Sequence, residues 1–128
     1  MASYTQELLK QGGFEYDWHS SLGGDIRVQN DDSPGCWDDM RVTLERVRDG
    51  SCRSDEWDAP LGRKYADIGE VKRKRARRHY RLYVTAERDR PGVLLLLHFA
   101  WKPGGKKGLE VQNGHIDEAF NRLMDWHR

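Results

Sequence analysis

Cationic side chains and two histidines gather in one part of this sequence, and these residue types suit chemistry on phosphate. Lys or Arg occupies seven of the eleven positions in 71–81, which also contain His79, and His98 and Lys102 follow in the next apolar segment. Positive charges at this density repel one another, and a phosphate backbone would relieve that repulsion. Histidine titrates near neutral pH, so it can donate or accept a proton. Together these residues suit binding of a phosphodiester and acid–base chemistry on it.

Both features also have a purely structural interpretation. Charges on a β-hairpin can keep a sheet edge from pairing with other chains, and charge alone leaves this interpretation and a binding site about equal. A lone histidine at the end of an apolar strand, such as His98, is more often a buried and hydrogen-bonded residue than a catalyst. Lys102 on the same face, with Lys106 and Lys107 just beyond it, favours a functional site.

Other reaction centres are not indicated. The sequence has no glycine-rich phosphate loop, nucleophile elbow or HExxH motif, and the remaining histidines lack metal-ligand spacing. These patterns indicate neither a metal site nor a cofactor site. Cys36 and Cys52 form no CxxC pair, which favours a reduced, cytoplasmic protein, although a disulfide between them remains open.

Composition agrees with a single globular domain over residues 1–128 that does not enter a membrane. The longest apolar run, 93–97, is far shorter than the roughly 20 residues that span a bilayer, and residues 1–10 lack the apolar core of a signal peptide. The 22 basic and 21 acidic residues nearly cancel, but acidic residues concentrate in 31–58 and basic residues in 63–81. One face should therefore be strongly positive.

Three consecutive antiparallel strands are expected to position the cationic residues. Period-two alternation and turn signals predict this meander, with a basic hairpin around 76–78 and a second turn at 88–92. The expected strands are Tyr65–Lys74, Tyr80–Glu87 and Val93–Trp101.

Strand alternation assigns the polar residues to a common face of this sheet. Arg81 and Tyr83 share one face of their strand. In the following strand His98 and Lys102 have the same parity, opposite to Leu97. The predicted polar face consists of His79, Arg81, Tyr83, Thr85, His98 and Lys102.

The rest of the chain is expected to be scaffold. Helix caps and apolar spacing predict three helices, and the pattern at 14–18 predicts an N-terminal strand. Trp37 belongs to the apolar stripe of the second helix and is expected in the core. The fold class is therefore α+β, a small antiparallel sheet packed by two to three helices. The expected helices are Ser3–Lys10, Pro34–Asp49 and His115–Arg128, and the expected loops are 22–34, with a short strand possible at Ile26–Val28, and 103–113.

Several linked motifs in residues 60–126 resemble the RelE/HigB superfamily of toxins from bacterial toxin–antitoxin systems, particularly its phage-derived branch. Glu70-Val71-Lys72 is similar to the family's Glu-Leu-Arg strand motif, and Tyr80-Arg81-Leu82-Tyr83 is similar to its next strand. The segment 96–102 then resembles the family's strand that ends in His, Phe and Lys, and Ala119 and Arg122 resemble its helical ending. The order and spacing of these motifs are more specific than any one of them.

The resemblance implies a RelE-like fold and cleavage of messenger RNA on the ribosome. The RNA 2′-hydroxyl would attack the adjacent phosphate, so neither metal nor cofactor is needed. Such a reaction requires a base, cations for the extra phosphate charge and an acid for the leaving oxygen. A cognate antitoxin protein, acidic or of mixed charge, is also implied as the partner that covers the positive face.

By motif position, the resemblance assigns roles to individual residues. Lys72 and Lys74 would face the RNA, one of them acting as the base because Arg73 and Arg75 crowd it, and Arg81 would clamp the phosphate. His98 is the alternative base or acid. The expected RNA-binding residues are Arg73, Arg75, Arg77, Arg78, Tyr83, Lys102, Lys106 and Lys107, with Tyr83 stacking on a base.

Two other classes of function remain open for this sequence. One is a toxin of the same fold that inhibits DNA gyrase by binding protein. The other is a nucleic-acid-binding or phage accessory domain without catalysis, whose binding would fall steeply with salt.

Overall fold

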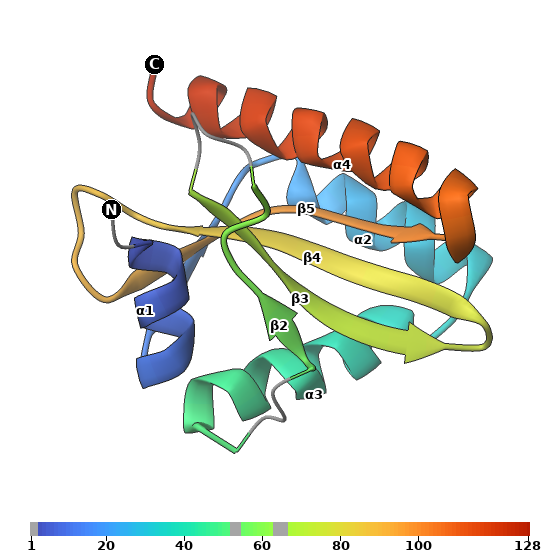
Figure 1. Cartoon of the computed structure of the whole chain (residues 1–128), viewed down its shortest axis with the longest axis horizontal. Helices are drawn as coiled ribbons and strands as arrows, with labels where there is room; N and C mark the ends of the chain where they lie inside the picture. The colour runs from blue at the N-terminus through green and yellow to red at the C-terminus, as the bar shows by residue number, and fades with distance from the viewer. Residues whose placement is uncertain (1–2, 52–54, 63–66) are drawn as a thin grey trace.

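A mixed five-stranded sheet lies at the centre of the molecule, between α4 on one face and α3 on the other (Figure 1). The computed structural model describes residues 3–51, 55–62 and 67–128. The α+β class is confirmed. The elements in chain order are α1 (Tyr4–Gln11), β1 (Glu15–Trp18), α2 (Leu22–Asp32), α3 (Cys36–Asp49), β2 (Trp57–Asp58), β3 (Ile68–Arg75), β4 (Arg78–Ala86), β5 (Val93–Lys102) and α4 (Gly105–Trp126).

The predicted meander and N-terminal strand are both present, in a sheet of order β1-β5-β4-β3-β2. β3, β4 and β5 pair antiparallel, whereas the N-terminal strand β1 joins β5 in parallel. The sheet is therefore mixed and has one strand more than expected, because the short β2 pairs with β3. The predicted start of the first meander strand at Tyr65 lies outside the described residues.

A two-residue turn connects β3 to β4. Ala76 and Arg77 both have positive φ, 49° and 66°, which is the backbone of the type I′ turns that match the twist of antiparallel strands. The turn places Arg75 opposite Arg78 and fixes the pairing of the whole basic hairpin.

Each face of the sheet packs against its own apolar core. Residues of α1, α2 and α3 pack on one face around Tyr80, Leu82 and Phe99. α4 packs on the other face, where Ile116 and Ala119 meet a second, smaller core. The sheet residues of this second core are Ile68, Tyr83, Leu95 and Leu97.

Residues 22–34 contain a helix where a loop, with a possible strand at Ile26–Val28, was predicted. Gly23 and Gly24 lower the intrinsic helix propensity of α2, but Leu22 is buried and Ile26 packs against the same core. Tertiary packing thus overrides the local signal. The predicted strand is wrong.

The C-terminal helix is also longer than predicted, because residues 105–113 are helical and not a loop. α4 begins at Gly105, and its first turn contains Lys106 and Lys107. Gly108 permits this start because a Cβ there would lie 1.8 Å from the carbonyl oxygen of Pro103. The absence of a side chain lets the helix approach the end of β5 closely.

The remaining predictions concern helix ends and cysteine. Ser3 caps α1 by accepting a hydrogen bond from Gln6 N, as predicted, and Gly50 ends α3 with φ 75°. α3 begins two residues later than expected, at Cys36, which is buried. The possible bridge to Cys52 lies outside the described residues. Within the described ranges, none of the helices has both the length and the apolarity needed to cross a bilayer.

Candidate nucleic-acid interface

Cationic side chains from β3 and β4 line a hollow of about 320 Å³ at the edge of the sheet. Among the described residues, the contact of the β2 segment with β3 ends at the Lys72 N–H, which donates to Glu56 O. The hollow opens beside the part of β3 that follows. Its lining residues are Thr43, Arg46, Asp55, Glu56, Lys72, Arg73, Lys74, His79 and Arg81.

Strand register brings the predicted polar residues together on the face that α4 covers in part. Lys72 lies opposite Arg81, and His79 lies between Lys74 on one side and Lys102 on the other. Alternation along each strand then points these five side chains to the same face. The predicted residues His79, Arg81, Tyr83, His98 and Lys102 do share one face, but this face is polar only toward the hairpin, because Tyr83 belongs to the apolar core beneath α4.

Lys72 and Lys74 are the accessible cations of this face. Lys72 is half-buried and Lys74 is exposed, and within the described part of the chain neither forms an ion pair. Arg73 and Arg75, which were expected to crowd Lys74, alternate to the opposite face. The two lysines are therefore available to bind an anion.

Arg81 is held in place from behind by a buried carboxylate. Its Nε lies 3.3 Å from Glu70 Oε1, and its Nη1 donates to Tyr80 O at 3.1 Å. Burial raises the pKa of Glu70, and the charges of Arg81 and Lys102 oppose this shift only in part. Glu70 thus orients the Arg81 guanidinium and is itself easier to protonate than an ordinary glutamate.

An amide bridge from α4 connects Glu70 to Lys102. Gln112 Nε2 donates to Glu70 Oε2 at 2.8 Å, and Lys102 Nζ donates to Gln112 Oε1 at 2.7 Å. Burial and then the charge of Arg81 lower the pKa of Lys102. The polar residues of the sheet and the first half of α4 therefore form one connected network.

His79 is the histidine that the hollow exposes. Its side chain is half-buried beside Lys74 and Arg81. Burial lowers its pKa, and the nearby charges of Arg81, Lys74 and Lys102 lower it further. A neutral imidazole among cations can accept a proton at neutral pH, so His79 is a candidate base. The sequence placed it on this face but assigned it no role.

His98 occupies a different position, beneath α4 and hydrogen-bonded to a carboxylate. Its Nδ1 lies 2.8 Å from Asp25 Oδ2, and its side chain is 12% exposed. Asp25 also receives Arg122 Nη1 at 2.6 Å and Nη2 at 2.9 Å, as well as the Phe99 N–H at 3.1 Å. These contacts match the structural interpretation of His98 more closely than the catalytic one.

Leu97 was predicted on the face of β5 opposite to His98, and this prediction is wrong. Tyr83 pairs with His98 but Val84 pairs with Leu96, so Leu97 is an extra residue in the strand. Leu97 and His98 consequently lie on the same face, toward α4. Such a bulge has no reliable signal in a run of four leucines.

Tyr83 is fully buried and its ring stacks on His98, with 6.1 Å between centroids. The expected stacking of an RNA base on Tyr83 does not fit this position.

Two buried polar atoms next to each other beneath α4 lack a partner. Tyr83 Oη has no hydrogen-bond partner among the described residues, and the same holds for Nδ1 of the adjacent His115. Burial first, and then the charge of His98, lower the pKa of His115 to about 4.

The arginines expected to bind RNA divide between the two faces. Arg75 Nε lies 2.8 Å from Asp39 of α3, and Arg78 forms an ion pair with Asp32 of α2 and lies over the Trp101 ring. Arg75 and Arg78 therefore hold the hairpin to the helices on the far side. Of the remaining predicted RNA-binding residues, Arg73 lines the hollow, Arg77 is exposed in the turn, and Lys106 and Lys107 are exposed at the start of α4.

Sequence reasoning assigned no catalytic or supporting role to Glu70, Gln112, Asp25 or Arg122. Glu70 shares the parity of Lys72 and could have been placed on this face. Gln112 and Asp25 lie in segments predicted to be loops, so no local signal pointed to them. The hydrogen bonds from Gln112 to Glu70 and from Arg122 to Asp25 join positions 42 and 97 residues apart, which only the tertiary structure reveals.

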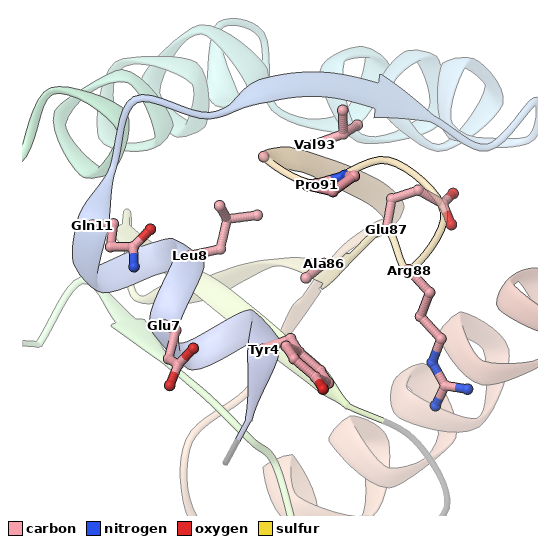
Figure 2. Close-up of a pocket in the computed structure, with 10 residues that line it drawn as sticks. Tyr4, Glu7, Leu8, Gln11, Ala86, Glu87, Arg88, Pro91 and Val93 are labelled. Carbon is pink, nitrogen blue, oxygen red and sulfur yellow. The ribbon is translucent and has the colours of Figure 1, made fainter.

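A larger hollow of about 570 Å³ lies between α1 and the turn that follows β4 (Figure 2). Its charged lining residues are Glu7, Glu87 and Arg88, so it lacks the cationic character that a phosphate requires. Chemistry therefore selects the smaller hollow as the candidate site.

Comparison of this chain with protein-family models, with curated proteins and with solved structures gives no match.

Proposed function

We propose that this protein is an endoribonuclease that cleaves messenger RNA on the ribosome without a metal ion, as the toxin component of a type II toxin–antitoxin system. The observation that carries this proposal is the convergence of Lys72, Lys74, His79 and Arg81 around one hollow. Cations, a titratable imidazole and an arginine fork are the groups that transfer within an RNA phosphodiester requires. The motif resemblance in 60–126 supports the same reaction. It would take place in the cytoplasm.

The proposed reaction uses residues on neighbouring strands. His79 accepts the proton of the RNA 2′-hydroxyl, and the 2′-oxygen forms a bond to the adjacent phosphorus. The bond from phosphorus to the 5′-oxygen breaks, and the ammonium of Lys74 donates a proton to that oxygen. Arg81 and Lys72 stabilise the additional negative charge on the phosphate. The products are a 2′,3′-cyclic phosphate and a 5′-hydroxyl.

The pairing of Lys74 with His79 supports this division of roles. The two residues are direct partners across β3 and β4, so their side chains leave the sheet side by side. Burial and then the nearest cations lower the pKa of His79, which favours its neutral form as the base. Arg81, one pair further along the strands with Lys72 opposite, lies where it can contact the same phosphate.

Cleavage of a reporter RNA on translating ribosomes tests the proposal. Lys74→Ala and His79→Ala should each lower the cleavage rate by at least about 100-fold, the lower end of what general acid–base catalysis contributes. Arg41→Ala is the matched control, because Arg41 is an exposed cation of α3 on the other side of the sheet. Circular dichroism should show that all three variants are folded.

Each alternative class has a distinct outcome, in this assay or in a parallel assay of DNA supercoiling by gyrase. Salt-sensitive RNA binding by the parent protein without any cleavage would establish a binding domain. Inhibition of DNA gyrase without cleavage would establish the other toxin class. Equal cleavage by the parent, Lys74→Ala and His79→Ala would refute the proposed site.

A cognate antitoxin is the proposed protein partner. The exposed cations Lys74, Arg77, Lys106 and Lys107 favour an acidic segment that covers this face, because complementary charge steers association. Such a segment should compete with RNA for the hollow.

A further inference from the structure

Three side chains that can bind a metal ion meet where the end of α4 approaches the turn after β4. Glu87 and Asp89 come from that turn, and His127 is the C-cap residue of α4. One possible ligand atom from each residue lies within 4.8 Å of the other two. The three residues also line a hollow of about 450 Å³ that shares no lining residue with the cationic hollow.

Glu87 is a buried carboxylate with an unsatisfied oxygen. Its side chain is 3% exposed, and Oε2 accepts a hydrogen bond from Trp126 Nε1 at 2.6 Å. Oε1 is buried and has no hydrogen-bond partner in the described ranges. Figure 2 shows the Glu87 and Arg88 side chains leaving the chain in different directions. A carboxylate oxygen left without a partner is costly to bury, and a bound cation would remove that cost.

The charge around this hollow also favours a cation. Asp17, Glu87 and Asp89 contribute three carboxylates to its lining, and Arg90 contributes one guanidinium. Arg90 Nη2 lies 2.6 Å from Asp17 Oδ2 but 3.9 Å from Glu87 Oε2. The arginine therefore mainly neutralises Asp17, and Glu87 and Asp89 keep an excess of negative charge beside His127.

We infer that Glu87, Asp89 and His127 bind one divalent transition-metal ion, with Zn²⁺ as the best match. Two carboxylates and an imidazole are ligands that Zn²⁺ accepts, and water would complete a tetrahedral set. Ligand atoms around a tetrahedral zinc lie about 3.4 Å apart. Asp89 and His127 are exposed, so their side chains are free to close the remaining distance.

The Trp126 N–H would hold the Glu87 carboxylate in orientation while the metal binds, as second-layer hydrogen bonds do in metal sites. A metal at this position would join the end of α4 to the β4–β5 turn. Since binding to the folded state alone stabilises it by mass action, Zn²⁺ should raise the melting temperature. This inference does not depend on RNA cleavage, because the two sites are separate.

Calorimetric titration of the full chain with ZnCl₂ tests the inference. We expect one Zn²⁺ per chain, and a dissociation constant raised at least about tenfold in His127→Ala and in Asp89→Asn. His79→Ala is the matched control, because it removes an imidazole outside the cluster and should bind Zn²⁺ as the parent does. Both cluster variants change exposed side chains, so the fold should be retained.

Melting curves give an independent readout on the same proteins. Excess Zn²⁺ should raise the melting temperature of the parent and of His79→Ala equally, and should raise that of His127→Ala by less, because stabilisation by a ligand falls as its dissociation constant rises. Absence of Zn²⁺ binding by the parent would overturn the inference. Binding by His127→Ala and Asp89→Asn with parental affinity would also overturn it, since the metal would then occupy another place.

Discussion

Replacement of Asp25 by Ala should destabilise the protein more than its position near the start of a glycine-containing helix suggests. The Asp25 carboxylate accepts hydrogen bonds from both terminal nitrogens of Arg122 and from the Phe99 N–H. It also forms a hydrogen bond with His98. The side chains of Asp25 and Arg122 are 13% and 11% exposed. Removal of the carboxylate would therefore leave a nearly buried guanidinium without its main partner.

Loss of one member of a buried ion pair costs about 3–5 kcal/mol. Because water still reaches a small part of both side chains, we expect the lower end, about 3 kcal/mol. With an unfolding entropy of about 2.1 cal/mol/K per residue, this corresponds to a melting temperature roughly 11 °C lower for a chain of 128 residues. Urea denaturation and thermal melting should both detect the change. Asp31→Ala, an exposed position on the same helix, is the control and should leave the midpoint unchanged.

A double-mutant cycle separates the ion pair from general damage to α2. Arg122→Ala should also destabilise, and the double variant should cost at least about 1 kcal/mol less than the sum of the two single variants. Strict additivity, or a cost below about 1 kcal/mol for Asp25→Ala, would show that this network does not hold α2, β5 and α4 together.

Acid should weaken the same contact. Burial favours the protonated form of Asp25, but the hydrogen bonds from His98 and Arg122 outweigh it and lower the pKa of Asp25 below 3.8. The stability that Asp25 contributes is therefore present above about pH 4, the unfolded value, and is lost as the pH falls further.

Two further predictions concern α4. The pKa of His115 is lowered from 6.5 to about 4, so His115 takes up a proton more readily in the unfolded chain, and stability should fall as the pH drops from about 6.5 to about 4. His115→Gln should make the urea midpoint depend less on pH in this range. An unchanged dependence would contradict the assignment. Gly108→Ala would place a Cβ 1.8 Å from Pro103 O, so the start of α4 must shift and the hydrogen bond from Lys102 to Gln112 should break. The free energy of unfolding should fall by about 1–3 kcal/mol. Amide hydrogens in 105–112 should exchange faster than in the parent, and exchange at the parental rate would refute the prediction.

The meander could be predicted from sequence because its signals are local. Alternating side chains and a basic turn defined β3 and β4, and Pro91 with Gly92 marked the next turn. These signals also placed Lys72, Lys74, His79 and Arg81 near one another, since register follows once the hairpin turn is known. The cationic part of the site could therefore be predicted from the sequence.

The residues that support the site could not be predicted, because their contacts join residues that are far apart in the sequence. α2 contains two glycines and forms because Leu22 and Ile26 reach the core, and its Asp25 gains a structural role only through Arg122 and His98. The extra residue at Leu97 changes which face a side chain takes, and alternation alone cannot detect it. Charge counting likewise could not separate Arg75 and Arg78, which hold the far face, from Lys72 and Lys74.

The chemical ends of the RNA fragments test the central claim most directly. After incubation of the protein with translating ribosomes, the upstream fragment should carry a 2′,3′-cyclic phosphate and the downstream fragment a 5′-hydroxyl. Both should form at least about 100-fold more slowly with Lys74→Ala or His79→Ala. Fragments with 3′-hydroxyl and 5′-phosphate ends, or intact RNA with the parent protein, would contradict cleavage by the 2′-hydroxyl at this site.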